Sequence, residues 1–309
     1  MPIPIIMDCD PGIDDAFSLA MAIASDELDI LGITTSYGNV GLEHTTNNTL
    51  RVLDWLGDKT PVYKGIDRAL LGPVVDASEY HGATGMEAPE IGPPTSVAQS
   101  QNAVMFMIET LMATRQKITL VASGPLTNIA MALRLEPRIA QHIERIVFMG
   151  GSTDYGNDSP AAEFNMLCDP YAGQIVLDAD IPKIMFGLNV THQVIATAEE
   201  VQRLRDLGND CGRVFADMAV YFETVYKETY GFGGSALHDP CTIAWLLAPE
   251  LFETRDMRVD VETTEGLSFG RTVHDIWNIA KKPVHTSVAL KADADGFFEL
   301  LRSLLIKLR

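Results

Sequence analysis

The sequence predicts an α/β fold: a single domain over residues 1–309 with a mainly parallel central sheet and flanking helices. Short apolar runs typical of buried strands alternate along the chain with segments of helical periodicity, which is the pattern of successive βαβ units. Hydrophobic residues make up 47% of the chain, enough for a large core. No linker, repeat or low-complexity tract divides the 309 residues, a length that one large α/β domain can reach.

The predicted elements alternate regularly from the N-terminus. The first strand covers residues 3–7, and a helix begins at Asp14. Later apolar runs are expected to form strands at residues 30–34, 118–122, 143–149, 183–188 and 285–290. Helices are expected at residues 43–56, 102–114, 199–206 and 241–247. The stretch 73–94 is rich in glycine and proline and has little periodicity, so we interpret it as a long functional loop.

Composition argues against several classes of protein. The formal net charge of −19 disfavours general binding to nucleic acid, which requires Lys and Arg to neutralise phosphates. No stretch approaches the roughly 20 apolar residues of a membrane span, and the N-terminus does not resemble a signal peptide. The four cysteines lie far apart without CxxC spacing, so we expect reduced thiols in a cytoplasmic protein. Cys9 is expected to be a buried filler, because neighbouring carboxylates raise a thiol pKa.

Four carboxylates crowd the turn between the first strand and the first helix: Asp8, Asp10, Asp14 and Asp15. Open α/β sheets bind ligands at such turns. Two like charges about 4 Å apart repel by roughly 4 kcal/mol at an effective dielectric near 20. These acids must therefore be protonated, point apart into solvent, or share a cation. In a simpler interpretation Asp14 and Asp15 favour a helix N-terminus and Asp8 is solvated; a donor set of carboxylates favours a hard cation.

Polar residues also follow the other predicted strands. They occur at residues 36–39, 123–128, 150–165 and 189–192. Because parallel strands bring their carboxyl ends to one edge of a sheet, acids, amides and glycines would gather there. Such an edge suits a polar small-molecule site.

Two Asp-Pro pairs are typical of helix starts, with Asp at the N-cap and Pro at the first helical position. For Asp169 we expect capping alone. For Asp239 capping and metal ligation both stay open, because a capping carboxylate keeps a second oxygen. His238, beside it, is either a buried structural histidine or a functional one.

The segment 157–165 brings Asn157, Glu163 and Asn165 close together in sequence. Amides and a carboxylate suit the hydroxyls of a sugar, which both donate and accept hydrogen bonds. A solvated loop would have a similar composition.

Three further residues are candidates for ligand contact. His81 lies in the long loop and belongs either to a lid or to an ordinary turn. Tyr226 and Tyr230 are four residues apart and would share a helix face. They either pack in the core or contact a planar ligand.

Together these motifs resemble the inosine-uridine nucleoside hydrolases. The resemblance rests on DCDPGIDDA at 8–16, GN at 38–39, SGPLTN at 123–128, AEFN at 162–165 and HDP at 238–240. It implies a Rossmann-like nucleoside hydrolase fold in which the acidic turn binds Ca²⁺. The implied metal ligands are Asp10, Asp15, the backbone carbonyl of Leu126, and Asp239. The family often has Thr where Leu126 stands, a change to which a carbonyl ligand is indifferent.

The resemblance also implies roles for the substrate-binding residues. Asp14, Asn157, Glu163 and Asn165 match residues that hold the ribose hydroxyls. Asn39 matches a polar residue near the metal, and His238 a histidine near the nucleobase. We assign His81 and Tyr226 to the substrate as well.

The expected reaction is hydrolysis of the N-glycosidic bond of a ribonucleoside to ribose and free base. Calcium would activate the water, and Asp10 would take its proton while charge like that of an oxocarbenium ion develops on the sugar. His238 or Tyr230 would supply a proton to the leaving base. Pyrimidine-preferring relatives carry a tyrosine eight residues before the histidine of the HDP motif, and Tyr230 has this spacing from His238, so the resemblance implies a preference for uridine and cytidine. Tyr226 stands where such relatives often have another polar residue, which keeps a broad purine and pyrimidine range open. The resemblance further implies a homo-oligomer, a tetramer or dimer, and we expect a role in nucleoside salvage.

Two other classes share part of the pattern. A DxD pair after the first strand is also typical of haloacid-dehalogenase-type phosphatases, but these place Thr or Val two residues after the second Asp, where this chain has Gly12. A non-catalytic nucleoside-binding receptor would use similar side chains. Such receptors are normally exported, and we see no export signal.

Overall fold

The structure is a computed structural model that describes residues 1–72, 82–86 and 91–309. In these ranges the main sheet is formed by β1 (Ile3–Cys9), β2 (Leu28–Thr35), β3 (Val62–Lys64), β4 (Ile118–Ala122), β5 (Ile143–Met149), β6 (Lys183–Phe186), β9 (Phe252–Val261), β10 (Thr272–Asp275) and β11 (Thr286–Ala292). A separate antiparallel pair consists of β7 (Ile195–Thr197) and β8 (Gly234–Ala236).

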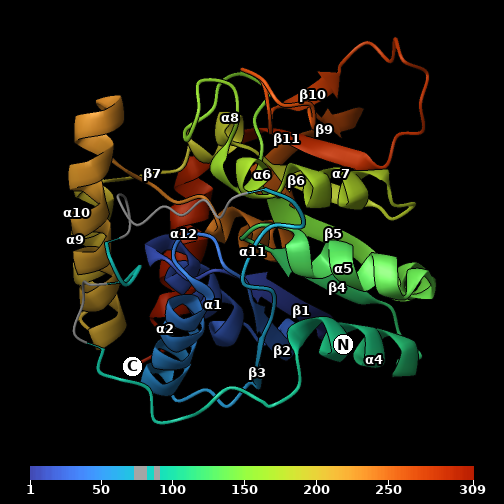
Figure 1. Cartoon of the computed structure of the whole chain (residues 1–309). Helices are drawn as coiled ribbons and strands as arrows, with labels where there is room; N and C mark the ends of the chain where they lie inside the picture. Colours follow the sequence, from blue (N-terminus) through green and yellow to red (C-terminus); the bar gives the residue numbers. More distant parts are fainter. Residues whose placement is uncertain (73–81, 87–90) are drawn as a thin grey trace.

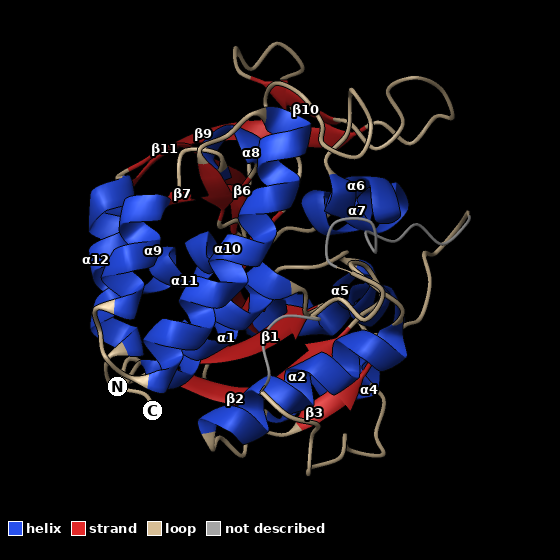
Figure 2. Ribbon diagram, turned by 90° about the vertical axis from the view of Figure 1, so that its left-hand side faces the viewer, coloured by secondary structure: helices blue, strands red, loops and turns tan. Residues whose placement is uncertain are grey.

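The helices flank this sheet (Figures 1 and 2). They are α1 (Ile13–Ala24), α2 (Leu42–Leu56), α4 (Ala103–Ala113), α5 (Thr127–Leu135), α6 (Phe164–Cys168), α7 (Pro170–Asp178), α8 (Leu188–Thr191), α9 (Ala198–Arg205), α10 (Asp210–Tyr230), α11 (Pro240–Leu247) and α12 (Ala294–Leu305). Two short 3₁₀ helices cover Pro137–His142 and Pro249–Leu251.

The strand order of the main sheet is β10-β9-β11-β6-β5-β4-β1-β2-β3. All neighbours from β11 to β3 are parallel, whereas β9 runs antiparallel to both β11 and β10. The chain builds outward from β1 through β2 to β3, and then continues on the other side of β1 with β4. The crevice beyond the carboxyl ends of β1 and β4 is thus a topological switch point, where open α/β sheets bind ligands.

Two hydrophobic cores lie on opposite faces of the sheet. In β1 the side chains of Ile5, Met7 and Cys9 enter one core, together with residues of α1, α11 and α12, while Ile6 enters the other with residues of α4, α5 and α7. This alternation follows from the two-residue period of a strand. Burial on both faces explains why the parallel strands have nearly continuous apolar sequences.

The predicted fold class is confirmed, and the predicted strands at 118–122 and 143–149 match β4 and β5. The strand predicted at 183–188 ends at Phe186, because Gly187 begins the short α8. The antiparallel edge was not predicted: β9 has an exposed, charged first half and so lacks an apolar run. Of the loop predicted at 73–94, residues 73–81 and 87–90 lie outside the described residues.

The structure bears on two expectations drawn from composition, one about the cysteines and one about membrane spans. All four cysteines are buried, and none of them forms a disulfide bond with another described residue. Within the described ranges, no helix combines the length and the apolar character needed to cross a membrane.

Candidate active site

The acidic segment lies at the switch point: Asp8 belongs to β1, Asp10 to the turn after it, and Asp14 and Asp15 to the first turn of α1. Its four aspartates are buried: Asp8 is 2% exposed, Asp10 1%, Asp14 4% and Asp15 0%. The interpretation of Asp8 as a solvated residue is therefore wrong. Its Oδ1 accepts hydrogen bonds from Thr34 Oγ1 at 2.6 Å and Asn128 Nδ2 at 2.8 Å, and burial raises the pKa of Asp8 to about 6.

Three carboxylates from distant parts of the chain converge at the start of α1. One oxygen each from Asp14, Asp15 and Asp239 lies within 4.8 Å of the others. Burial raises the pKa of Asp239 well above its ordinary value, and the charges of Asp14 and Asp15 add to the rise. Burial, and then the neighbouring Asp15, raise the pKa of Asp14 to about 7. Holding all three ionised therefore requires a positive charge among them.

Asp239 occupies the N-cap position of α11, with Pro240 at the first helical position, but its side chain makes no capping hydrogen bond. The interpretation of Asp239 as a helix cap alone is therefore wrong.

Asp10 approaches the backbone of two loops. Its Oδ2 accepts a hydrogen bond from the Asn39 backbone N–H at 2.7 Å, while its buried Oδ1 has no hydrogen-bond partner among the described residues. A Cβ at Gly38 would lie 1.9 Å from Oδ2, and one at Gly124 2.5 Å from Oδ1. Glycine at both positions is thus what lets this carboxylate lie against the backbone.

Asn39 and Ser123 hold Asp15 in place. Asn39 Nδ2 donates to the Asp10 carbonyl at 3.1 Å and to Asp15 Oδ2 at 3.2 Å, so one amide links the two acids. Ser123 Oγ donates to Asp15 Oδ1 at 2.6 Å, and the Gly12 N–H donates to Oδ2 at 3.0 Å. Asp15 therefore supports the start of α1 and also faces the acidic cluster.

These residues fit a hard divalent cation. The donors are buried carboxylate oxygens, and the unpartnered Oδ1 of Asp10 offers a further one. The Leu126 carbonyl accepts from the Ala130 N–H at 2.9 Å and keeps a second lone pair. No thiolate competes, because the Cys9 Sγ donates to the Thr34 carbonyl and burial raises its pKa well above the ordinary value. Ligation by Asp10, Asp15, Leu126 and Asp239 stays a prediction.

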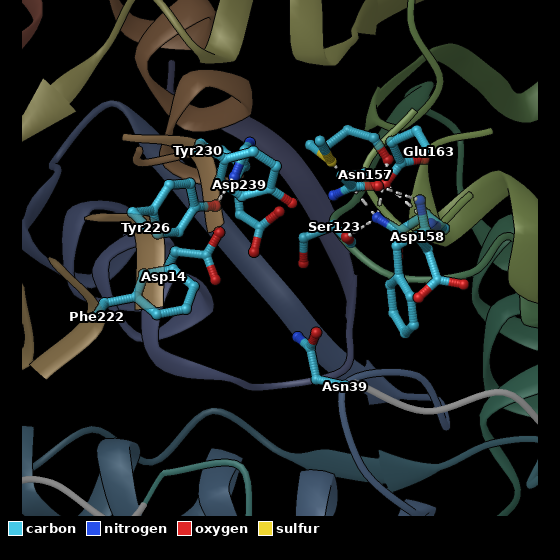
Figure 3. A pocket seen from close by; sticks show the side chains of 14 residues that line it. Asp14, Asn39, Ser123, Asn157, Asp158, Glu163, Phe222, Tyr226, Tyr230 and Asp239 are labelled. Carbon is cyan, nitrogen blue, oxygen red and sulfur yellow. Dashed lines mark hydrogen bonds between the residues drawn. The ribbon is translucent and has the colours of Figure 1, made fainter. Parts of the chain in front are cut away.

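Two members of the acidic cluster, Asp14 and Asp239, line a cavity, and in Figure 3 they lie beside Tyr226 and Tyr230. The cavity encloses about 590 Å³ of space between the atoms, its open mouth included. Its lining consists of Asp14, Asn39, Ser123, Met149, Asn157, Asp158, Glu163, Phe164, Asn165, Phe222, Tyr226, Tyr230, His238 and Asp239.

One wall carries the predicted sugar-binding residues. The Glu163 carboxylate accepts hydrogen bonds from the backbone N–H groups of Gly151, Asn165 and Met166, and burial raises its pKa to about 7. Asn165 Nδ2 donates to the Ser123 carbonyl at 2.6 Å and to the Met149 carbonyl at 3.2 Å. Two carbonyl partners fix the orientation of the amide, so Oδ1 is the acceptor that remains.

Asn157 completes this wall, with its Oδ1 accepting from the Phe164 N–H at 2.9 Å. Glu163 and Asn165 are buried, so the alternative of a solvated loop is wrong for these two residues.

The opposite wall is aromatic and comes from α10. Tyr226 and Tyr230 share a helix face as predicted, with ring centroids 5.4 Å apart, and both line the cavity. His238 is buried between two hydroxyls: its Nδ1 lies 2.7 Å from Thr191 Oγ1, and its Nε2 is hydrogen-bonded to the Tyr226 hydroxyl. The third candidate for ligand contact, His81, lies outside the described residues.

Several lining or supporting residues were not predicted. Phe222 precedes Tyr226 by four residues, so the spacing that identified the two tyrosines could also have identified it. Ser123 lies in the SGPLTN motif at 123–128, but no role was predicted for its side chain. Thr191 lies in the polar segment 189–192, but its contact with His238 could not be predicted, because it depends on packing between residues 47 positions apart.

This geometry can be compared with known proteins. The family model described as inosine-uridine preferring nucleoside hydrolase matches residues 5–299. The pyrimidine-specific ribonucleoside hydrolase RihA of Enterobacter sp. (strain 638) is 42% identical over 303 residues, which cover 97% of each chain. A solved structure of a purine-preferring ribonucleoside hydrolase from Gardnerella vaginalis is similar with a TM-score of 0.91 and 33% identity, covering 98% of both chains.

A second solved structure, an inosine-guanosine nucleoside hydrolase, is similar with a TM-score of 0.89 and 25% identity, again over 98% of both chains. The match to the family model and the identity to the curated relative each extend over nearly the whole chain. This chain therefore belongs to the inosine-uridine preferring nucleoside hydrolase family, the enzymes that cleave ribonucleosides into ribose and free base.

Proposed function

We propose that this protein uses calcium to hydrolyse the N-glycosidic bond of ribonucleosides, with uridine and cytidine as preferred substrates. The observation that carries the proposal is the cavity, which joins a buried acidic cluster to a sugar-binding wall and an aromatic wall. Carboxylate and carbonyl oxygens are the ligands that calcium prefers. When bound, calcium would hold the vicinal ribose hydroxyls and lower the pKa of a water molecule.

The residues of the chain account for the proton transfers. In the reaction the bond between the anomeric carbon and the base nitrogen breaks, and the oxygen of water bonds to that carbon. Asp10 takes one proton of the water, through the buried Oδ1 that has no partner among the described residues. The departing base takes a proton from His238 or Tyr230, which line the opposite wall.

The sugar wall supports the charge that develops during bond cleavage. The ring becomes positively charged as the base leaves, as in the cleavage of O-glycosides. Glu163 lies in this wall and is held by three backbone N–H groups. A nearby positive charge favours the ionised form of a carboxyl group, so Glu163 stabilises the transition state as an anion.

Two observations bear on the preferred base. The pyrimidine-specific relative is 42% identical to this chain, whereas the purine-preferring structure is 33% identical. Tyr230 lines the cavity from the end of α10, at the spacing from His238 that favours pyrimidines. The Tyr226 hydroxyl is hydrogen-bonded to His238. Because pyrimidine-preferring relatives often have another polar residue at the position of Tyr226, hydrolysis of both purine and pyrimidine nucleosides is the second candidate.

The test is release of ribose from a panel of uridine, cytidine, inosine, adenosine and guanosine, with calcium and with excess chelator. We expect turnover with calcium only, and faster turnover of the two pyrimidines. Comparable rates on all five would favour the broad-specificity alternative. Binding of uridine without ribose release would favour a receptor, and magnesium-dependent release of phosphate from nitrophenyl phosphate would favour a phosphatase.

The assignment of Asp10 is tested with Asp10→Asn and Asp10→Ala. Both are expected to abolish ribose release while circular dichroism shows a folded protein. Asp10→Asn keeps an oxygen that can accept from Asn39, so it separates loss of the base from loss of this hydrogen bond. Asp26→Ala, at an exposed position at the end of α1, is the matched control. A near-normal rate for Asp10→Asn would remove Asp10 as base and ligand.

The resemblance further suggests a homo-oligomer, a tetramer or dimer, that acts in nucleoside salvage in the cytoplasm. Light scattering after size-exclusion chromatography measures the oligomeric state directly. A monomer at working concentration would contradict this part of the proposal.

A further inference from the structure

Thr191, the last residue of α8, contacts His238 without lining the cavity. Its side chain is buried, and its Oγ1 lies 2.7 Å from Nδ1 of His238. The two residues are 47 positions apart and belong to different segments, one following β6 and the other following β8. The cavity-lining residues include His238 but not Thr191. Thr191 therefore lies behind the histidine, on the side away from a substrate.

Both ring nitrogens of His238 are hydrogen-bonded to hydroxyl groups. Tyr226 from α10 is bonded to Nε2, and Thr191 from α8 is bonded to Nδ1. A flip of the ring about its long axis would exchange nitrogens for carbons and break both hydrogen bonds. The two hydroxyls together thus select one orientation of the ring. Tyr226 lines the cavity, where a ligand would contact it, whereas Thr191 is buried and does not line the cavity.

Backbone hydrogen bonds hold Thr191 in place. The Thr191 N–H donates to the Gly187 carbonyl at 3.1 Å, which closes the turn of α8. The Thr191 carbonyl accepts from the Val194 N–H at 3.0 Å, and the Val194 carbonyl accepts from the Leu237 N–H at 3.0 Å. Leu237 immediately precedes His238. A short chain of backbone hydrogen bonds therefore sets the Thr191 hydroxyl against the histidine before any ligand binds.

We infer that Thr191 is a positioning residue, whose hydroxyl holds the His238 ring so that Nε2 points toward Tyr226 and the leaving base. The inference rests on the proposed function, in which His238 assists departure of the base. Outer partners that orient a functional histidine are typically worth about 10- to 100-fold in activity where they have been measured at metal sites. Because Thr191 acts through His238, its effect should depend on how much help the leaving group needs.

The test compares uridine with nitrophenyl riboside, whose leaving group departs without a proton. Thr191→Val replaces the hydroxyl by a methyl group of similar size. We expect it to lower kcat for uridine by about tenfold, to change KM little, and to leave turnover of nitrophenyl riboside nearly unchanged. Thr191→Ser keeps the hydroxyl and should restore most of the lost rate.

Two further variants control the experiment. Thr49→Val removes a buried hydroxyl that donates to the Thr45 carbonyl within α2, so it measures the general effect of such a change. His238→Ala should reduce uridine turnover far more than turnover of nitrophenyl riboside. In the His238→Ala background Thr191→Val should cause no further loss of uridine turnover, because the imidazole ring that the Thr191 hydroxyl holds is absent.

The outcomes separate the inference from the function on which it rests. Equal losses on both substrates with Thr191→Val, or an additional loss in the His238→Ala background, would overturn the positioning role while His238 keeps its own. Equal losses on both substrates with His238→Ala would remove His238 from the leaving-group step, and the inference with it. Failure of the wild-type protein to release ribose from any nucleoside would instead refute the proposed function.

Discussion

Asp169 and Asp239 each precede a proline at the start of a helix, yet their side chains have different surroundings. Both are buried, at 1% and 4% exposure. Asp169 Oδ1 accepts from the Ala172 N–H at 3.0 Å and caps α7, while Oδ2 accepts from Thr127 Oγ1 and from the Leu70 N–H, both at 2.8 Å. Asp239 makes no capping hydrogen bond and converges with Asp14 and Asp15.

The difference arises from the neighbours and not from the motif. Burial raises the pKa of Asp169, but four hydrogen-bond donors act against the rise. At Asp239 burial and three carboxylates act in the same direction. A buried acid surrounded by donors stabilises the fold, whereas a buried acid surrounded by acids destabilises it unless a cation is present. Asp169 thus has a structural role, whereas the surroundings of Asp239 agree with its proposed role as a metal ligand.

The strongest test of this contrast is Asp239→Asn. The neutral amide keeps the shape of the side chain but removes a charge from the proposed cation site. We expect ribose release from uridine to fall by about a thousandfold or more, which corresponds to about 4 kcal/mol of transition-state stabilisation. The protein should stay folded, because the change relieves repulsion among buried carboxylates. A rate within a few fold of the wild type would contradict a functional role for Asp239.

The matched change at the other helix start, Asp169→Ala, should affect stability instead. It removes a helix cap and leaves the Thr127 hydroxyl and the Leu70 N–H without their acceptor. A lost cap costs about 1 kcal/mol and an unsatisfied buried donor about 1–3 kcal/mol, so we expect a loss of roughly 3 kcal/mol. Urea denaturation measures this change, and ribose release by the folded fraction should stay near the wild-type rate. A large loss of kcat with unchanged stability would contradict a structural role for Asp169.

Calcium should distinguish the two aspartates in a third way. A ligand that binds only the folded state stabilises it by about 2.7 kcal/mol at a hundred times its Kd. Calcium added to chelator-treated protein is therefore expected to raise the Tm of the wild type. In Asp169→Ala calcium should raise the Tm by the same amount, starting from a lower Tm. In Asp239→Asn calcium should raise the Tm little or not at all. An equal increment in all three proteins would place calcium elsewhere.

The two Asp-Pro pairs show which features of the fold and site could be predicted from the sequence and which could not. Local patterns predicted β4 and β5 to the residue and located the acidic turn at a strand end, because apolar runs and turn chemistry are local properties. The same local pattern at two helix starts could not reveal which aspartate would meet other carboxylates. That outcome depends on the packing of α11 against α1, more than 200 residues apart in sequence.

The missed elements have related causes. The first half of β9 is exposed and charged, so its strand character comes from pairing with β11 and β10 and not from an apolar pattern. The contact between Thr191 and His238 is likewise a product of tertiary structure. The local motifs predicted several residues that line the cavity, whereas the residues that support them from behind could not be predicted.

The smallest expected effect is the dependence of stability on pH, which tests the electrostatic side of the contrast. Burial raises the pKa of Asp8 from 3.8 to about 6 and that of Asp14 from 3.8 to about 7. Below pH 4 both groups are protonated in the folded and unfolded chains, and the full stability is present. As the pH rises toward 7 the unfolded chain releases these protons more readily than the folded one, so stability is lost.

In chelator the free energy of unfolding should therefore decrease between about pH 4 and 7, by up to about 1.4 kcal/mol per pH unit for each titrating group. Calcium should flatten the decrease, because a bound cation favours the ionised carboxylates. Asp14→Asn should reduce the slope near pH 7, where Glu163 also titrates, and Asp169→Ala should leave that part of the slope in place. Urea denaturation at several pH values measures each slope. If stability instead rises with pH in the absence of divalent cations, the charges of the buried acids are already compensated by other groups of the protein. That result would contradict the need for a cation among these carboxylates.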